Sequence, residues 1–321
     1  MFATFFSSAI RISATFLYGS TGEIIIEKSG HLNLGIPGVM SVGGAVGVIM
    51  EYYLIKAMGT TVPFLLVLVP VLASLIAGGL MGLLYSFLTV SLRANQNVVG
   101  LAMTTFGVGL AGYLVTGMQG KLAIVTRASK YYTNLFNIAS DNWFVQIFLS
   151  YGILVYLAII IAIVAQIVLS KTRVGLNLRA VGENPATADA AGINVIAYKY
   201  TATCIGSAIA GLGGLFHIMD YMVGNWEYIL DSFGWLCIAL VIFTLWRPAL
   251  SILGSFIFGA LYISASYIPQ IVPGLALEVT EILKMLPYVV TVVVLIITSL
   301  FDKKSTQPPA SLGLPYFREE R

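Results

Sequence analysis

The sequence alternates long apolar runs with short polar intervals over most of its length. A helix needs about 20 mainly apolar residues to cross the hydrocarbon core of a bilayer. Runs of this kind lie at residues 3–26, 41–55, 62–90, 98–120, 146–170, 200–222, 250–268 and 284–301. The pattern predicts an all-α polytopic membrane protein with about eight transmembrane helices, within a range of about eight to ten.

Two segments depart from simple spans. The run at 3–26 has no charged segment before it, so we interpret it as a first membrane helix and not as a cleaved leader. Arg11 and Glu23 lie within this run, which indicates that the helix faces protein more than lipid. Residues 121–145 mix charged and aromatic side chains, and this composition predicts a loop with an interfacial helix.

The longest polar interval is residues 171–199, and its local chemistry predicts a pair of short helices. Gly182 interrupts a first helical stretch, Asn184 is a suitable cap for a second, and Pro185 fits the first helical position. Gly192 supplies a left-handed stop. Between the apolar runs on either side, such a compact polar knob is expected to meet a partner in water.

Backbone breaks occur in both halves of the chain. Residues 27–40 are rich in Gly, contain a Pro and lead directly into an apolar run, and the short apolar segment 232–246 ends at Arg247-Pro248. Irregular backbone at membrane depth survives where it is buried or lines a polar cavity. Paired interrupted segments indicate a substrate path in an inverted-repeat transporter, so we predict an inverted repeat here.

Composition excludes several function classes. The chain is 58% hydrophobic and 10% charged with a net charge of +3, so nothing indicates nucleic-acid binding. Cys204 and Cys237 lie in apolar runs, and no disulfide, metal site or cofactor is expected. His217 is expected to be a hydrogen-bonded packing residue. No P-loop sequence occurs, so the chain is not expected to bind ATP by that route, and no acidic cluster of the kind common in ion-driven transporters lies within the spans.

Basic residues predict the orientation. If residues 27–34, 91–97, 171–199, Arg247 and the tail are cytoplasmic, 11 Lys and Arg lie inside and 5 outside, with Arg11 in the first helix. We therefore expect residues 1–301 to form a transmembrane domain with a cytoplasmic loop at 171–199, and residues 302–321 to form a cytoplasmic polar tail.

Several short motifs resemble those of ABC importer permeases of the branched-chain amino acid, ribose and nucleoside branch. They are Gly182-Glu183-Asn184 with Gly192-Ile193-Asn194-Val195, Asn33-Leu34-Gly35 with Gly38 and Met40, Asn95 to Gly100, and the tail from Pro309. The pattern is most similar to nucleoside permeases that work with basic membrane lipoproteins, although Ala186 and Pro37 stand where family motifs often have Glu. The resemblance implies an ATPase-coupling site at Gly182, Glu183, Asn184, Ala188 and Gly192.

The same resemblance implies a membrane-embedded transport subunit that is not itself an enzyme. Its expected partners are an ATPase subunit, a second permease subunit (identical or not), an extracellular substrate-binding lipoprotein and membrane lipids. The residues proposed for the translocation path are Asn33, Gly35, Gly38, Asn97, Thr104 and Thr105. The alternatives are that both asparagines only cap helices, and that the chain is a stand-alone secondary transporter or facilitator.

Overall fold

The computed structural model describes residues 2–118, 120–133, 142–226, 230–271, 279, 282–283, 285–300 and 307–317. Across these residues the regular structure is helical, without a strand. The long helices are α1 (Phe2–Glu27), α2 (Ile36–Met58), α3 (Pro63–Ser86), α4 (Gln96–Thr116), α7 (Ile153–Lys171), α10 (Val195–Phe216), α11 (Leu230–Phe243), α12 (Pro248–Ile271) and α14 (Leu286–Leu300).

Shorter helical elements connect the long ones. They are the π-helical turns η1 (Phe87–Ser91) and η3 (His217–Tyr221), the 3-10 turn η2 (Leu122–Ile124), α5 (Thr126–Thr133), α6 (Trp143–Phe148), α8 (Arg173–Glu183) and α9 (Pro185–Ala190). The predicted helix pair in the polar interval is therefore confirmed as α8 and α9. The interfacial helix expected within 121–145 corresponds to α5, whereas residues 134–141 lie outside the described part of the chain.

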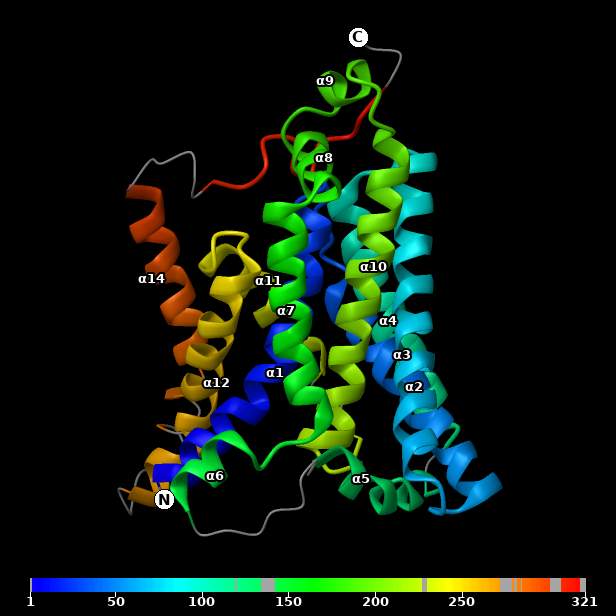
Figure 1. Cartoon of the computed structure of the whole chain (residues 1–321), viewed down its shortest axis with the longest axis vertical. Coiled ribbons are helices and arrows are strands. Elements are labelled where there is room, and N and C mark those ends of the chain that lie inside the picture. The colour runs from blue at the N-terminus through cyan, green and yellow to red at the C-terminus, as the bar shows by residue number, and fades with distance from the viewer. Residues whose placement is uncertain are drawn as a thin grey trace.

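The helices form one elongated bundle with two distinct ends (Figure 1). The end that carries α8, α9 and the C-terminal segment is called the α8–α9 face, and the end with the N-terminus, α5 and α6 is the opposite face. In the described residues six helices are long and apolar enough to cross a membrane, namely α2, α3 with η1, α4, α7, α10 with η3, and α12. The chain is thus a polytopic all-α membrane protein.

The short helix α11 decides the parity of the bundle. A chain that begins at one face and ends at the other must cross the membrane an odd number of times. Helix α11 and the other eight long helices give nine crossings in the described residues. That number lies within the expected range. Gly234 of α11 lies against Pro37 of α2, because a Cβ on this glycine would come 2.8 Å from the Pro37 Cβ. The two interrupted segments predicted from the sequence therefore meet directly.

The single helix expected at 146–170 is divided in the structure. α6 ends at Phe148, and α7 begins only at Ile153 after a connection that includes Gly152. The backbone of Gly152 lies directly against the carbonyl group of Tyr132 in α5, where a side chain would not fit. Tertiary packing of α5 beneath α7 therefore overrides the continuous apolar pattern.

Helix α10 is the centre of the bundle, and small residues set its contacts. Gly206 lies against Gly22 of α1, and Gly211 lies between Gly43 of α2 and Gly78 of α3. Because lipid is as apolar as a side chain, helices in membranes associate through close van der Waals packing, which glycine allows. The outer helices α3, α4 and α7 instead expose large apolar side chains, as expected for a lipid-facing surface.

The helices α3 and α10 end in the same way. In η1 the Leu92 N–H donates to the Phe87 carbonyl, and in η3 the Met222 N–H donates to the His217 carbonyl. Each π-helical turn is followed by a residue with positive φ, which is Arg93 at 57° after η1 and Val223 at 54° after η3. The two ends lie at opposite faces (Figure 1). Such matching ends are the local structure that the predicted inverted repeat would produce.

Candidate functional site

The α8–α9 pair is built by side-chain caps. The Thr172 hydroxyl accepts from the Gly175 N–H at 3.1 Å at the start of α8, and the Asn184 side chain accepts from the Thr187 N–H at 3.0 Å at the start of α9. Pro185 is the first residue of α9, and Gly192 has φ +83° just beyond it. These caps and the left-handed stop confirm the local predictions. They fix α9 as a short knob at the end of the molecule.

The five predicted coupling residues divide into an outer and an inner set. Glu183, Asn184 and Gly192 are exposed, and a Cβ on Gly192 would meet nothing within 4 Å. Ala188 is buried at 3% exposure and packs in a small apolar cluster beneath α9. The exposed residues of α9 itself are Ala186, Thr187 and Ala190, and their small side chains allow close contact with another protein surface.

Gly182 belongs to the inner set and does not interrupt the helix. It lies in the last turn of α8, which ends one residue later at Glu183. The absence of a side chain lets the Lys28 carbonyl approach its backbone. Burial lowers the pKa of Lys28, while the charge of Glu183 acts in the opposite direction. Gly182, one of the five predicted coupling residues, is thus in contact with the connection between α1 and α2.

A C-terminal strap, residues 307–317, crosses the α8–α9 face and joins these segments (Figure 1). The N–H and the hydroxyl of Ser311 both donate to the Gly182 carbonyl, at 3.0 and 2.6 Å. The Gly313 N–H donates to the Gly30 carbonyl at 3.2 Å. The Tyr316 hydroxyl donates to the Asp189 carboxylate of α9 at 2.9 Å. The strap therefore connects both α8 and α9 to the α1–α2 connection.

Four of the six predicted path residues are brought together where α2 begins. Gly38 packs against the backbone of α4 at Thr104, whose hydroxyl donates to the Leu34 carbonyl at 2.7 Å. The Asn33 side chain accepts from the Gly35 N–H at 2.9 Å, and the Asn33 N–H donates to the Glu23 carboxylate at 3.2 Å. Asn33 is buried and its amide nitrogen has no hydrogen-bond partner in the described residues.

The other two predicted path residues lie apart from this group, on the exposed surface of α4. Asn97 is not the cap of α4, because the Asn95 side chain accepts from the Asn97 and Val98 N–H groups. The Thr105 hydroxyl donates to the Leu101 carbonyl of its own helix at 3.2 Å. The sequence did not distinguish these outward positions from Asn33, which faces the interior.

Two buried acids lie near the break, and neither was assigned to the path or to the coupling site from the sequence. Glu23 and Glu27 are on α1 and are almost fully buried. The indole N–H of Trp246, which follows α11, donates to the Glu27 carboxylate. One Glu23 oxygen has no hydrogen-bond partner in the described residues. Their spacing of four residues at the end of an apolar helix was the available signal, because it places both on one helix face.

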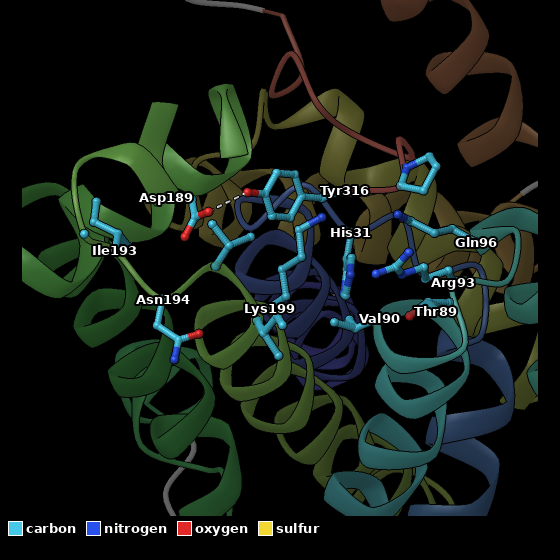
Figure 2. Close-up of a pocket in the computed structure, with 14 residues that line it drawn as sticks. His31, Thr89, Val90, Arg93, Gln96, Asp189, Ile193, Asn194, Lys199 and Tyr316 are labelled. Atoms are coloured by element: carbon cyan, nitrogen blue, oxygen red, sulfur yellow. Dashed lines mark hydrogen bonds between the residues drawn. The ribbon is translucent and has the colours of Figure 1, made fainter. Parts of the chain in front are cut away.

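A polar cavity of about 370 Å³ opens beside α9 on the same face. Figure 2 shows Lys199 and Arg93 entering it from two sides, with His31 between them and Tyr316 of the strap above. Burial lowers the pKa of His31 well below its usual range, so its imidazole is neutral. Its Nδ1 atom lies 3.0 Å from the Thr203 hydroxyl. The coupling segment, the break and the strap all contribute walls to this cavity.

The opposite half of the membrane region contains a second polar group. Arg11 forms an ion pair with Asp220 at 3.3 Å, which accounts for a charged residue in the first span. His217 lies 3.3 Å from the Thr15 hydroxyl and packs against the Phe233 ring, so the predicted packing role is confirmed. In the described residues no group of three or more His, Cys, Asp or Glu side chains is arranged to hold a metal.

Comparison with known families identifies the chain. The model of the branched-chain amino acid transport system permease component family matches residues 5–296. The chain belongs to this family. It is therefore an integral membrane permease, a transport subunit and not an enzyme, and the family implies an ATPase and a substrate-binding protein as partners.

Relatives match this permease over nearly its full length. The nucleoside ABC transporter permease protein NupC of Lactococcus lactis is 32% identical over 96% of this chain and 95% of its own. The guanosine ABC transporter permease protein NupQ of Bacillus subtilis is 28% identical over 98% of both chains. A putative glucose ABC transporter permease protein of Haloferax volcanii, TsgC13, is 28% identical over 79% of this chain and 74% of its own.

Proposed function

We propose that this permease imports nucleosides as one subunit of an ATP-binding cassette complex. The observation that carries the substrate class is the full-length similarity to permeases named for nucleosides and guanosine. The complex would contain a second permease subunit and an extracellular substrate-binding lipoprotein, because the nucleoside branch that the sequence resembles is organised in this way.

The α8–α9 face is proposed to be cytoplasmic and to dock on the ATPase. Its support is the exposed knob of α9, whose small side chains and exposed Gly192 allow close contact. Motion of this knob would reach the membrane by two routes. Gly182 contacts the α1–α2 connection directly, and the strap is hydrogen-bonded both to Gly182 and to that connection. ATP hydrolysis by the partner would thereby move the break before α2.

The translocation path is proposed to run beside this break. Asn33, Gly35, Gly38 and Thr104 form its inner wall, because their close packing holds polar backbone at membrane depth. Asn97 and Thr105 belong to the exposed surface of α4. Asn97 lies in the first turn of α4, within the polar interval 91–97 that is expected to be cytoplasmic, so its exposed amide is available for contact with another subunit. We therefore place Asn97 at the contact with the second permease subunit, where the path would lie between subunits.

Reconstituted transport tests the substrate class. The permease with its ATPase, second subunit and binding protein would be placed in liposomes and supplied with labelled nucleosides, pentoses or branched-chain amino acids. ATP-dependent uptake of nucleosides alone, competed by unlabelled guanosine, is the expected result. Uptake of a pentose or an amino acid without nucleoside uptake would replace the proposed substrate while leaving the permease assignment unchanged.

A further inference from the structure

The cavity beside α9 contains two cations that the transport proposal does not use. Lys199 belongs to the second turn of α10 and is only 3% exposed. Arg93 follows η1 and has φ +57°, so its backbone adopts the left-handed region that side chains other than glycine rarely occupy. Figure 2 shows both side chains directed into the same space, from opposite sides of His31.

Neither cation is neutralised within the described residues. The ion pair found there joins Arg11 to Asp220, far from this cavity. Asp189 is the one carboxylate among the residues that line the cavity, and it accepts from the Tyr316 hydroxyl at 2.9 Å. Arg93 is exposed and contacts the face of the Phe317 ring at 5.1 Å, without a carboxylate partner in the described residues. A buried ammonium without an anion is unfavourable, so the cavity favours an anionic occupant.

Two helix ends add positive potential to the same cavity. The first turn of α10, with Asn194 to Ile196, and the first residue of α4, Gln96, both line it. The N-terminus of a helix carries a partial positive charge that favours anions, although the caps Asn95 and Asn194 already accept from N–H groups in the first turns of α4 and α10. The Gln96 amide is already used, because it accepts from the Leu32 N–H and donates to the Leu314 carbonyl. The attraction therefore comes from the two cations and the helix ends.

We propose that this cavity binds a phosphate group, with Lys199 and Arg93 as its charged ligands. Arginine binds phosphate oxygens through two parallel N–H donors and lysine acts as a point charge, so the pair suits a doubly charged tetrahedral anion. The volume of about 370 Å³ lies within the range of about 300 to 1,000 Å³ typical of small-molecule sites. A soluble phosphate ester such as a nucleoside monophosphate and an anionic lipid headgroup share this chemistry.

A phosphate group bound in this cavity would affect the proposed route of coupling. The walls include α9, the α1–α2 connection and the strap, which are the segments proposed to transmit motion, and the starts of α4 and α10 complete them. A phosphate held by Lys199 and Arg93 would link α10 to the η1–α4 connection across this gap. The site therefore gives a cytoplasmic phosphate compound a means of restraining the permease.

Direct binding tests the proposal. The full-length chain would be placed in nanodiscs of zwitterionic lipid without its ATPase, since an ATPase binds nucleotides itself. Equilibrium dialysis with labelled inorganic phosphate and labelled guanosine monophosphate should show saturable binding. Lys199→Met and Arg93→Gln should each weaken binding roughly tenfold or more, Lys199→Arg should largely restore it, and Lys121→Gln at the opposite face should leave it unchanged.

A second arm identifies the source of the phosphate group. In this arm the chain is purified with phosphatidylglycerol and washed in detergent. If the lipid is the ligand, free phosphate competes poorly and retained phosphatidylglycerol falls in Lys199→Met and Arg93→Gln but not in Lys121→Gln. The proposal is overturned if neither ligand binds the wild-type chain, or if both variants bind as it does. Because the readout is binding alone, this result does not depend on whether the permease carries nucleosides.

Discussion

At the scale of single residues, small side chains at close contacts decide the packing. Gly107 of α4 lies against Gly38, and a Cβ on Gly107 would come 2.6 Å from the Gly38 backbone. Gly109, two positions further on the same helix, has open space around it. Composition alone treats these two glycines as equal, although only one of them holds α4 against the break before α2.

Replacing Gly107 should therefore destabilise the folded protein. Gly107→Ala should lower stability by about 1 to 3 kcal/mol, because the added methyl group overfills a well-packed contact. Gly109→Ala should leave stability unchanged or slightly higher. Thermal unfolding of the purified variants in detergent provides the measurement, and equal melting temperatures for the two would contradict the close contact between α2 and α4.

A charge on the proposed path should stop transport. Asn33→Asp places an acid beside the buried Glu23, and Asn97→Asp places one on the exposed surface of α4. Both variants should lose nucleoside uptake while the complex still assembles. Asn95→Asp is the matched control, because it keeps the cap of α4 on a polar connection and should transport normally. Normal uptake in both path variants would remove Asn33 and Asn97 from the path.

At the scale of elements, α9 and the strap act on the same region from two sides. The knob of α9 is exposed. The strap instead joins α8 to the α1–α2 connection, because Ser311 is hydrogen-bonded to Gly182 and Gly313 to Gly30. A polar tail would be free to move if nothing held it, but these bonds make it part of the fold. We therefore expect α9 to serve in docking and the strap to serve in transmission.

Changes on α9 should prevent docking. Gly192→Trp adds bulk to an exposed left-handed position and Glu183→Arg reverses an exposed charge, so both should abolish uptake while membrane insertion is retained. Gly192→Asn and Glu183→Gln should retain most activity, because asparagine tolerates the left-handed region and glutamine keeps the size of the side chain. Co-purification of the ATPase with each variant gives the measurement. Unchanged uptake and ATPase recovery in the first two variants would exclude α9 as the docking element.

Substitutions in the strap should uncouple transport from ATP hydrolysis without preventing the ATPase from docking. Ser311→Val removes the hydroxyl that donates to Gly182 and adds bulk at a buried position. We expect ATP hydrolysis to continue while nucleoside uptake per ATP falls severalfold. Leu314→Ser is the control, because its side chain is exposed and its carbonyl bond to Gln96 remains. An unchanged ratio of uptake to hydrolysis in Ser311→Val would show that the strap transmits nothing.

At the scale of the whole molecule, α11 sets the orientation of everything after it. Only with α11 as a passage do the N-terminus and the strap lie at opposite faces. The distribution of Lys and Arg predicts that the α8–α9 face lies in the cytoplasm. With an odd number of membrane crossings, this orientation predicts that the N-terminus lies outside.

Cysteine accessibility tests this orientation. In a chain with Cys204 and Cys237 replaced by alanine, Lys121→Cys should react with an impermeant thiol reagent added to intact cells. Lys171→Cys should react only after the membrane is opened. Both positions are exposed, so burial does not explain a difference between them. The reverse pattern would place α9 outside and exclude its contact with an ATPase.

The sequence by itself determined the class of the fold and the local form of α8 and α9. Apolar runs must be helical in a bilayer, because every backbone group has to be paired within its own segment. The caps at Asn184 and Gly192 depend only on residues nearby in the chain, so they can be predicted without a structure. The break between Glu27 and Ile36 was also expected, from the glycines in and after it and from the nearby Pro37.

Only the tertiary structure decided which distant residues meet. The contacts of Gly182 with Lys28, of Ser311 with Gly182 and of Trp246 with Glu27 join segments far apart in the chain. Apolar periodicity does not specify these partners, since many faces of similar apolar helices would pack equally well in lipid. Close glycine contacts and buried hydrogen bonds select one arrangement among them. The cavity that contains Lys199 and Arg93 exists only because that arrangement brings the strap, α4 and α10 together.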